Sequence, residues 1–268
     1  MNENLNMIYN RLFLKNGISQ NISAFISGGD NIGTSWCTLS LAHALNLDKN
    51  KVLLIDGNGD FSNIASYLNL QNPQYLEYYI DGRKTLNQLV CAYKNKDFHI
   101  LTGQSGNKYL EEQPLGRIHL LADDLNIVAE NYDQTLIDIG TNISKQTLGL
   151  CQISNNIVLI CSENNADLIK TFDLIKFLNE IDLPANYYLI INKVNSFEDG
   201  YKIYEKLSKA ADRNRFNFPE LLGIIRNDTR VRDTIKNKEL LLSRYPTSEA
   251  AADISCIAKK LSKGAPHG

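Results

Sequence analysis

The stretch that decides the fold is Phe25–Leu45, FISGGDNIGTSWCTLSLAHAL, in which a short apolar run is followed by a glycine loop and an apolar helix. Its centre, GGDNIGTS, fits the phosphate-binding pattern G-x-x-x-x-G-K-[ST] everywhere but one position, because Thr34 stands in place of the lysine. The stretch therefore predicts a strand, a loop shaped like a phosphate cradle, and a helix that starts near Ser35.

Apolar, β-branched runs recur along the chain, and most are separated by segments with helical spacing. Strands are predicted at Ile22–Ser27, Val52–Ile55, Phe98–Leu101, Thr135–Ile139, Ile157–Cys161, Tyr187–Ile191 and Leu221–Ile225. Helices are predicted over Thr38–Leu45, Leu115–Tyr132, Asp167–Glu180, Gly200–Ala211 and Glu249–Leu261, with Leu120 and Ile169 among their apolar faces. This alternation predicts an α/β fold, a doubly wound and mostly parallel sheet with helices on both faces.

The 268 residues, 43% of them hydrophobic, can build one large domain, predicted over residues 21–262 with tails at 1–20 and 263–268. A formal charge of −2 and a pI near 6.1 give no overall attraction to nucleic acid or anionic lipid. No apolar run approaches the ~20 residues of a membrane span, and the first residues lack the order of a secretory signal. The five cysteines are far apart and are predicted to be reduced, so we expect a cytoplasmic protein.

Polar residues directly after the strands point to one edge of the sheet, where ligands bind in such folds. Asp56 directly follows the second predicted strand, and Asp138 lies at the end of the fourth. Together with Ser35 they form the skeleton of a site in which a hydroxyl and an aspartate hold Mg²⁺ beside a phosphate loop. A purely structural alternative stays open, because Ser, Thr, Asn and Asp also cap helices and turns.

Six segments carry a family resemblance. They are SGGDNIGTS (27–35), VLLIDGNGDFSNIASYLNL (52–70), HILTGQSG (99–106), TLIDIGTNIS (135–144), LIINKV (189–194) and LLGIIRNDTRVRDTIKNKELLLSRYPTSEAA (221–251). In this order, over roughly residues 22–262, they resemble the MinD/ParA superfamily and, within it, the flagellar-number regulators called FlhG, FleN or YlxH. The pieces HILTGQSG and RYPTSEAA favour the flagellar branch over the cell-division and plasmid branches.

The resemblance implies a site with nucleotide-binding residues and Mg²⁺ ligands, both expected to be vestigial. The implied nucleotide-binding residues are Gly28, Gly33, Thr34, Ser35, Asp56 and Asn192, and the implied metal ligands are Ser35 and Asp138. In the family, a signature lysine crosses a dimer to the partner's nucleotide, but here that position is Gly29. The lysine of the general motif is replaced by Thr34, two loop glycines by Asp30 and Asn31, and the adenine-side proline by Arg226.

These substitutions weaken the phosphate site, because phosphoryl transfer depends on cations near the β- and γ-oxygens. The loop loses two lysines and gains a carboxylate, and one charge pair ~4 Å apart is worth ~4 kcal/mol at an effective dielectric of ~20. A net loss of several kcal/mol would move a micromolar affinity to about millimolar. The sequence thus predicts no tightly bound cofactor, leaves weak binding of ATP or ADP with Mg²⁺ open, and argues against turnover.

The leading hypothesis is a non-catalytic pseudo-ATPase that resembles FlhG and regulates flagellar number, placement or gene control through protein contacts. The resemblance implies partners such as the GTPase FlhF, flagellar switch proteins or a transcriptional activator. Two alternatives stay open, a weak ATPase completed by a partner's cation and a TadZ-like pilus-localisation protein. We expect a monomer or a nucleotide-independent dimer, no direct nucleic-acid binding by the mixed-charge segment around Arg230, and no membrane association of the C-terminal helix.

Overall fold

The structure is a computed structural model that describes residues 21–58, 64–70, 73–103, 109–141 and 143–263. The prediction of tails at both ends falls almost entirely outside these residues. None of the described helices is both long and apolar enough to cross a lipid bilayer.

One sheet organises the described chain, with the strand order β3-β4-β2-β5-β1-β6-β7-β8. All neighbouring strands are parallel except the pair β3 and β4 at one edge. The strands are β1 (Ile22–Ser27), β2 (Val52–Asp56), β3 (Cys91–Tyr93), β4 (Asn95–Leu101), β5 (Gln134–Gly140), β6 (Asn156–Ser162), β7 (Asn186–Val194) and β8 (Glu220–Arg226). Strand β5 lies between β1 and β2, and β2 and β5 end in Asp56 and near Asp138 at the edge of the sheet where the loop after β1 begins.

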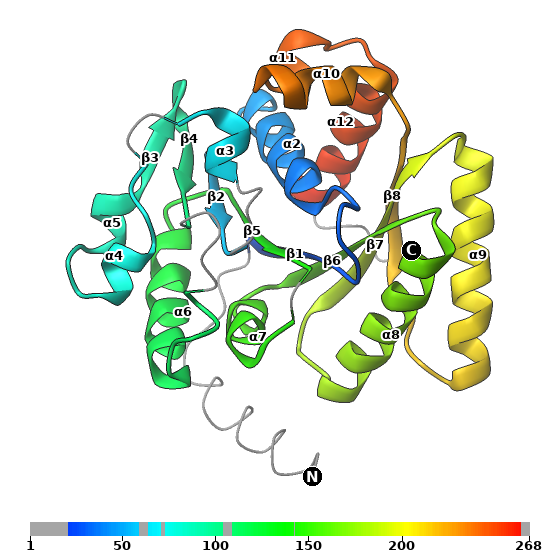
Figure 1. The fold of residues 1–268 in the computed structure, drawn as a ribbon, viewed down its shortest axis with the longest axis horizontal. Helices are drawn as coiled ribbons and strands as arrows, with labels where there is room; N and C mark the ends of the chain where they lie inside the picture. The colour runs from blue at the N-terminus through cyan, green and yellow to red at the C-terminus, as the bar shows by residue number, and fades with distance from the viewer. Residues whose placement is uncertain (1–20, 59–63, 71–72, 104–108, 142, 264–268) are drawn as a thin grey trace.

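Helices cover both faces of the sheet (Figure 1). One face carries α2 (Thr34–Leu47), α3 (Ile64–Leu68), α10 (Thr229–Asn237), α11 (Leu241–Arg244) and α12 (Glu249–Ser262). The other carries α4 (Glu77–Ile80), α5 (Leu86–Leu89), α6 (Leu115–Ala129), α7 (Lys145–Gln152), α8 (Asn165–Ile181) and α9 (Phe197–Asn214). The predicted doubly wound α/β architecture is confirmed.

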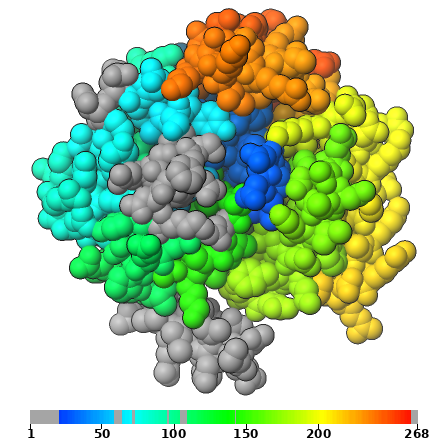
Figure 2. Space-filling view, in the orientation of Figure 1, coloured from blue at the N-terminus to red at the C-terminus, as the bar shows by residue number. Residues whose placement is uncertain are grey.

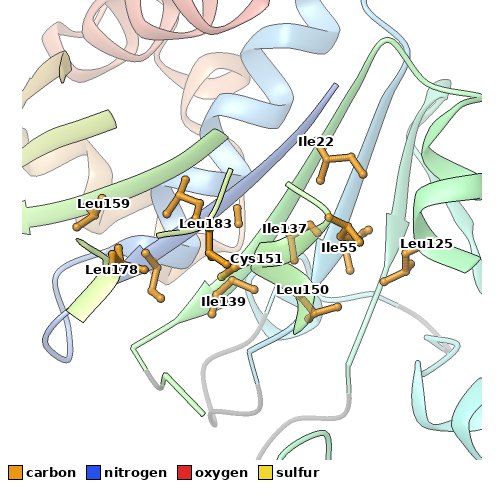
Figure 3. Packing of buried hydrophobic residues seen from close by; sticks show 14 of the residues in the cluster. Ile22, Ile55, Leu125, Ile137, Ile139, Leu150, Cys151, Leu159, Leu178 and Leu183 are labelled. Atoms are coloured by element: carbon orange, nitrogen blue, oxygen red, sulfur yellow. The ribbon is translucent and has the colours of Figure 1, made fainter. Parts of the chain in front are cut away.

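Alternating strand residues divide the interior into two apolar clusters, because successive side chains of a strand point to opposite faces. In β1, Ile22, Ala24 and Ile26 join the cluster under α6, α7 and α8, whereas Phe25 joins the one under α2 and α12. Figure 3 shows part of the first cluster, where side chains from the strands meet those of the covering helices. Helix α2 is buried along nearly its whole length, which explains why its sequence contains no Asp, Glu, Lys or Arg.

The structure corrects the predicted elements in two respects. Leu120 of α6 and Ile169 of α8 were expected on buried faces, but their side chains are 64% and 65% exposed. The sequence also did not predict β3 or the helices α3, α4, α5, α7 and α11. Most of these are single turns or three-residue pieces, too short to show a periodic pattern.

Candidate functional site

The loop between β1 and α2 has the backbone shape of a phosphate-binding loop. Asn31 and Gly33 both adopt left-handed conformations, with φ of 59° and 98°. Alternation of left-handed residues turns successive amides toward one concavity, which forms a nest for an anion at the positive end of a helix. Gly28 allows the loop to pass close to α8, since a Cβ atom there would lie 2.6 Å from the carbonyl oxygen of Lys170. The loop thus contains left-handed residues of the kind that such a nest requires.

The side chains at the start of α2 are turned inward. The Thr34 hydroxyl donates to Ser27 Oγ at 2.7 Å, and Ser27 Oγ in turn donates to the Gly29 carbonyl at 3.2 Å. The next residue, Ser35, is buried, and its Oγ accepts a hydrogen bond from the side-chain amide of Asn58 at 3.4 Å. Thr34 thus closes the base of the loop by neutral hydrogen bonds and provides no charge for a phosphate.

Asp56 and Asp138 lie opposite each other at the ends of β2 and β5 and are fully buried. Asp56 accepts hydrogen bonds from the amides of Asn58 (3.3 Å) and Ile64 (2.9 Å), and Asp138 accepts one from the Gly140 amide (3.1 Å). Burial, followed by the nearby charge of Asp138, raises the pKa of Asp56 well above its ordinary value. The two carboxylates therefore form a coupled pair beneath the loop.

A cavity of about 660 Å³ opens beside the loop, within the range of about 300–1,000 Å³ typical of small-molecule sites. Its lining runs from Asp30–Trp36 to the start of α10. Four predicted site residues, Gly33, Thr34, Ser35 and Asn192, line it, but Gly28, Asp56 and Asp138 do not. In Figure 2 the dark-blue loop reaches the surface near the centre of the visible face, with the orange α10 and α11 region above it.

Asn58 links the loop to the carboxylate pair. Its side-chain amide donates to Ser35 Oγ at 3.4 Å, and its backbone amide donates to Asp56 at 3.3 Å. It also lines the cavity and packs against Gly140, whose hypothetical Cβ atom would lie 2.5 Å from the Asn58 side-chain carbon. Of the two predicted Mg²⁺ ligands, Ser35 lines the cavity and Asp138 does not. Among the described residues there is no group of three or more His, Cys, Asp or Glu side chains arranged to hold a metal.

Asn192 links β7 to the loop. Its side-chain amide donates to the Ile32 carbonyl at 2.8 Å, and its side-chain oxygen accepts from the Lys193 amide at 2.9 Å. It is almost completely buried, yet it borders the cavity next to Gly33. Both functional groups of this amide are used within the protein, so Asn192 shapes the loop from the side where an adenine was expected.

Position 29 is closed to a longer side chain. A Cβ atom on Gly29 would lie 2.8 Å from the Asp167 carboxylate and 3.4 Å from the Lys170 side chain. Asp167 is held in place because its other oxygen accepts a 2.6 Å hydrogen bond from the Ser162 hydroxyl. A lysine at this position needs Asp167 to shift, so the neighbouring helix α8 is adapted to a glycine here.

Arg226, which stands where the resemblance places the adenine-side proline, ends β8 and has fixed partners. Its guanidinium is 2.9 Å from Asp253 and 2.6 Å from Glu249, and it lies over the Phe197 ring at 4.5 Å. The hydrogen bond to Asp253 raises the pKa of Arg226. Although Arg226 lines the cavity, two carboxylates already balance its charge.

The sequence analysis missed Lys193, whose side chain also lines the cavity. Its ammonium group donates a hydrogen bond to the Asn31 carbonyl, at the lip of the loop. The strand-end rule that singled out Asp56 could have found it, because Lys193 follows the predicted strand Tyr187–Ile191 at the same edge of the sheet. The site therefore contains a cation close to the loop, although none comes from the loop itself.

Comparison with known proteins supports the resemblance. No family model matches the chain. The antiactivator FleN of Pseudomonas aeruginosa is 22% identical over 244 residues, which cover 90% of this chain and 85% of FleN. The septum site-determining protein MinD of Pyrococcus horikoshii, solved with Mg-ADP, superposes with a TM-score of 0.75 at 18% identity, covering 92% of this chain and 97% of MinD.

A plasmid partition protein from Borrelia burgdorferi, solved with AMPPNP, superposes with a TM-score of 0.74 at 18% identity and covers 92% of this chain and 100% of that one. Identity this low shows a common fold and nothing finer. The chain therefore shares the fold of these two structures, and over nine-tenths of its length it is similar in sequence to FleN.

Proposed function

We propose that this protein is a FleN-like regulator that acts through protein partners and does not hydrolyse ATP. The proposal rests on the residues at the two positions where the family resemblance places lysines, and on what these residues contact. Thr34 is engaged with Ser27, and Gly29 lies against Asp167. The loop therefore keeps a backbone cradle without the cations that stabilise charge in phosphoryl transfer.

The cavity supports weak nucleotide binding. It is large enough for a small ligand, and the left-handed residues Asn31 and Gly33 direct amides toward an anion. One charge pair ~4 Å apart is worth ~4 kcal/mol at an effective dielectric of ~20, so without the lysines we expect affinities for ATP or ADP of about millimolar. Any Mg²⁺ would be held by Ser35 and Asp138 and would supply part of the missing positive charge.

Release of inorganic phosphate and titration with a fluorescent ATP analogue test the proposal. The purified protein should release no phosphate above the buffer background. The variant Thr34→Lys, which returns the motif's cation, should bind the analogue about tenfold more tightly or better. Thr34→Ser is the matched control, because it keeps the hydroxyl that contacts Ser27 without adding charge.

The same cavity favours a second function, a weak ATPase completed by a partner. Binding tighter than about 10 μM that is lost in both Ser35→Ala and Asp138→Asn would support this alternative. Phosphate release that begins only when a candidate partner is added would overturn the proposal of a non-hydrolysing regulator. A regulator of the FleN type should instead bind its partner equally well with and without ATP.

A further inference from the structure

We propose that Lys193 supplies the positive charge for phosphate groups bound in this loop, in place of the lysines that the loop lacks. The inference rests on the proposed nucleotide site and names the residue on which binding there depends. Three independent features support it, namely the position of the ammonium group, the backbone that places it there, and the engagement of the neighbouring cation.

The ammonium group of Lys193 lies at the mouth of the cradle. It donates to the carbonyl of Asn31, one of the left-handed residues that shape the anion nest. The Lys193 Cε atom would lie 3.7 Å from a Cβ atom on Gly33, so the aliphatic part of the side chain passes directly over the loop. An ammonium group has three donors, so it can hold Asn31 and an anion in the nest at the same time.

A bulge in β7 directs this side chain. Asn192 pairs with Ile225 and Val194 pairs with Arg226, so Lys193 is the extra residue between two successive pairs. It adopts a left-handed backbone with φ of 63°, which is uncommon for a residue with a long side chain. Bulges and left-handed residues of this kind redirect side chains next to functional sites. Without the bulge, Lys193 would continue the regular alternation of the strand.

Lys193 has no carboxylate partner among the ion pairs of the described residues, whereas Arg226 is held by Asp253 and Glu249. Asp30, the acidic residue of the loop, accepts a hydrogen bond at 3.1 Å from the hydroxyl of Thr141, which directly follows β5. Both residues line the cavity. The Asp30 carboxylate is thus engaged with Thr141 and not with Lys193. The charge of Lys193 is available to a ligand.

Titration with ATP and with adenosine, by calorimetry, tests the role of Lys193. Lys193→Met should weaken ATP binding about tenfold to a hundredfold, the effect of losing one charge-assisted hydrogen bond, and should leave adenosine binding unchanged. Lys193→Arg should retain most of the affinity for ATP. Lys236→Met is the matched control, because it removes an equal charge from α10, which borders the cavity, at a position that does not line it.

A second measurement avoids substitution altogether. Lysine acetylation followed by mass spectrometry, with ATP at about ten times its dissociation constant, should slow modification of Lys193 about tenfold and leave Lys236 unaffected. Equal ATP affinity in Lys193→Met and wild type, or no protection of Lys193, would overturn this inference and leave the proposed nucleotide site intact. Failure of the wild type to bind ATP at millimolar concentration would overturn both the inference and weak nucleotide binding, but not regulation through protein contacts.

Discussion

At the scale of single residues, the chemistry of the site depends on a few buried polar groups. Asp56 and Asp138 pair at the ends of β2 and β5, where both side chains are fully buried. Burial of a carboxylate disfavours its charged form, and a second carboxylate nearby adds to that effect. Such a pair makes the stability of the protein sensitive to pH.

We predict that Asp138→Asn reduces the dependence of stability on pH. The pKa of Asp56 is raised in the folded protein, whereas an aspartate in the unfolded chain has a pKa of about 4. The contribution of Asp56 to the free energy of unfolding is therefore fully present below about pH 4 and is lost as the pH rises through the folded-state pKa. Asparagine removes the repulsion and keeps an acceptor for the Gly140 amide. The free energy of unfolding at pH 7 should rise by on the order of 1 kcal/mol.

Urea denaturation between pH 4 and pH 8 measures this effect. Asp123→Asn, which removes an exposed carboxylate from α6, serves as the control and should leave the pH dependence unchanged. A decline in stability with pH that is equally steep in Asp138→Asn and in wild type would show that Asp138 does not influence Asp56.

At the scale of elements, the sequence predicted the framework well and the site less well. Seven predicted strands correspond to β1, β2 and β4–β8, because continuous apolar β-branched runs are distinctive of buried parallel strands. Strand β3 has three residues and one partly accessible edge, which leaves no pattern to detect. Leu120 and Ile169 were misplaced because helical spacing identifies an apolar face but not what covers it.

The position of Lys193 could not be predicted for a different reason. Its direction depends on the bulge between β7 and β8, and a bulge is set by the pairing of two strands and not by the residues of one. The closure of position 29 by Asp167 likewise depends on how closely α8 approaches the loop. Motif spacing identified the cradle, whereas packing between distant segments determines the charges around it.

We predict that Gly28→Ala destabilises the protein by about 2–3 kcal/mol, because the new methyl group meets the backbone of α8, which cannot move aside as a side chain can. Gly116→Ala is the matched control. No atom lies within 4 Å of a Cβ atom on Gly116, which is in α6, so this change should be neutral or stabilising by up to about 1 kcal/mol. Thermal and chemical denaturation of both variants compares them, and equal stabilities would contradict the described approach of α8.

At the scale of the whole molecule, the arrangement bears on assembly. The family resemblance implies that a lysine at position 29 crosses to a partner's nucleotide, and this chain has a glycine packed against Asp167 there. A nucleotide bound in the cavity therefore lacks the contact that would couple it to a second copy. The association state should be set by surfaces other than the loop.

We predict that ATP with Mg²⁺ does not change the mass of the protein in solution. Gel filtration coupled to light scattering, with and without millimolar nucleotide, measures this directly. The variant Thr34→Lys is a useful comparison, because better nucleotide binding alone should still not produce a dimer. A shift from monomer to dimer on addition of ATP to the wild type would contradict the prediction.

The hydrogen bond between Lys193 and Asn31 joins residues 162 positions apart in the chain. The cradle and the charge beside it are therefore encoded in separate stretches of the gene, and mutation can alter one without touching the other. A chain without the motif lysine can therefore recognise an anion through a cation on one distant strand. Relatives that also lack the motif lysine can be classified by the residue at the position of Lys193 in β7, as well as by the glycine motif.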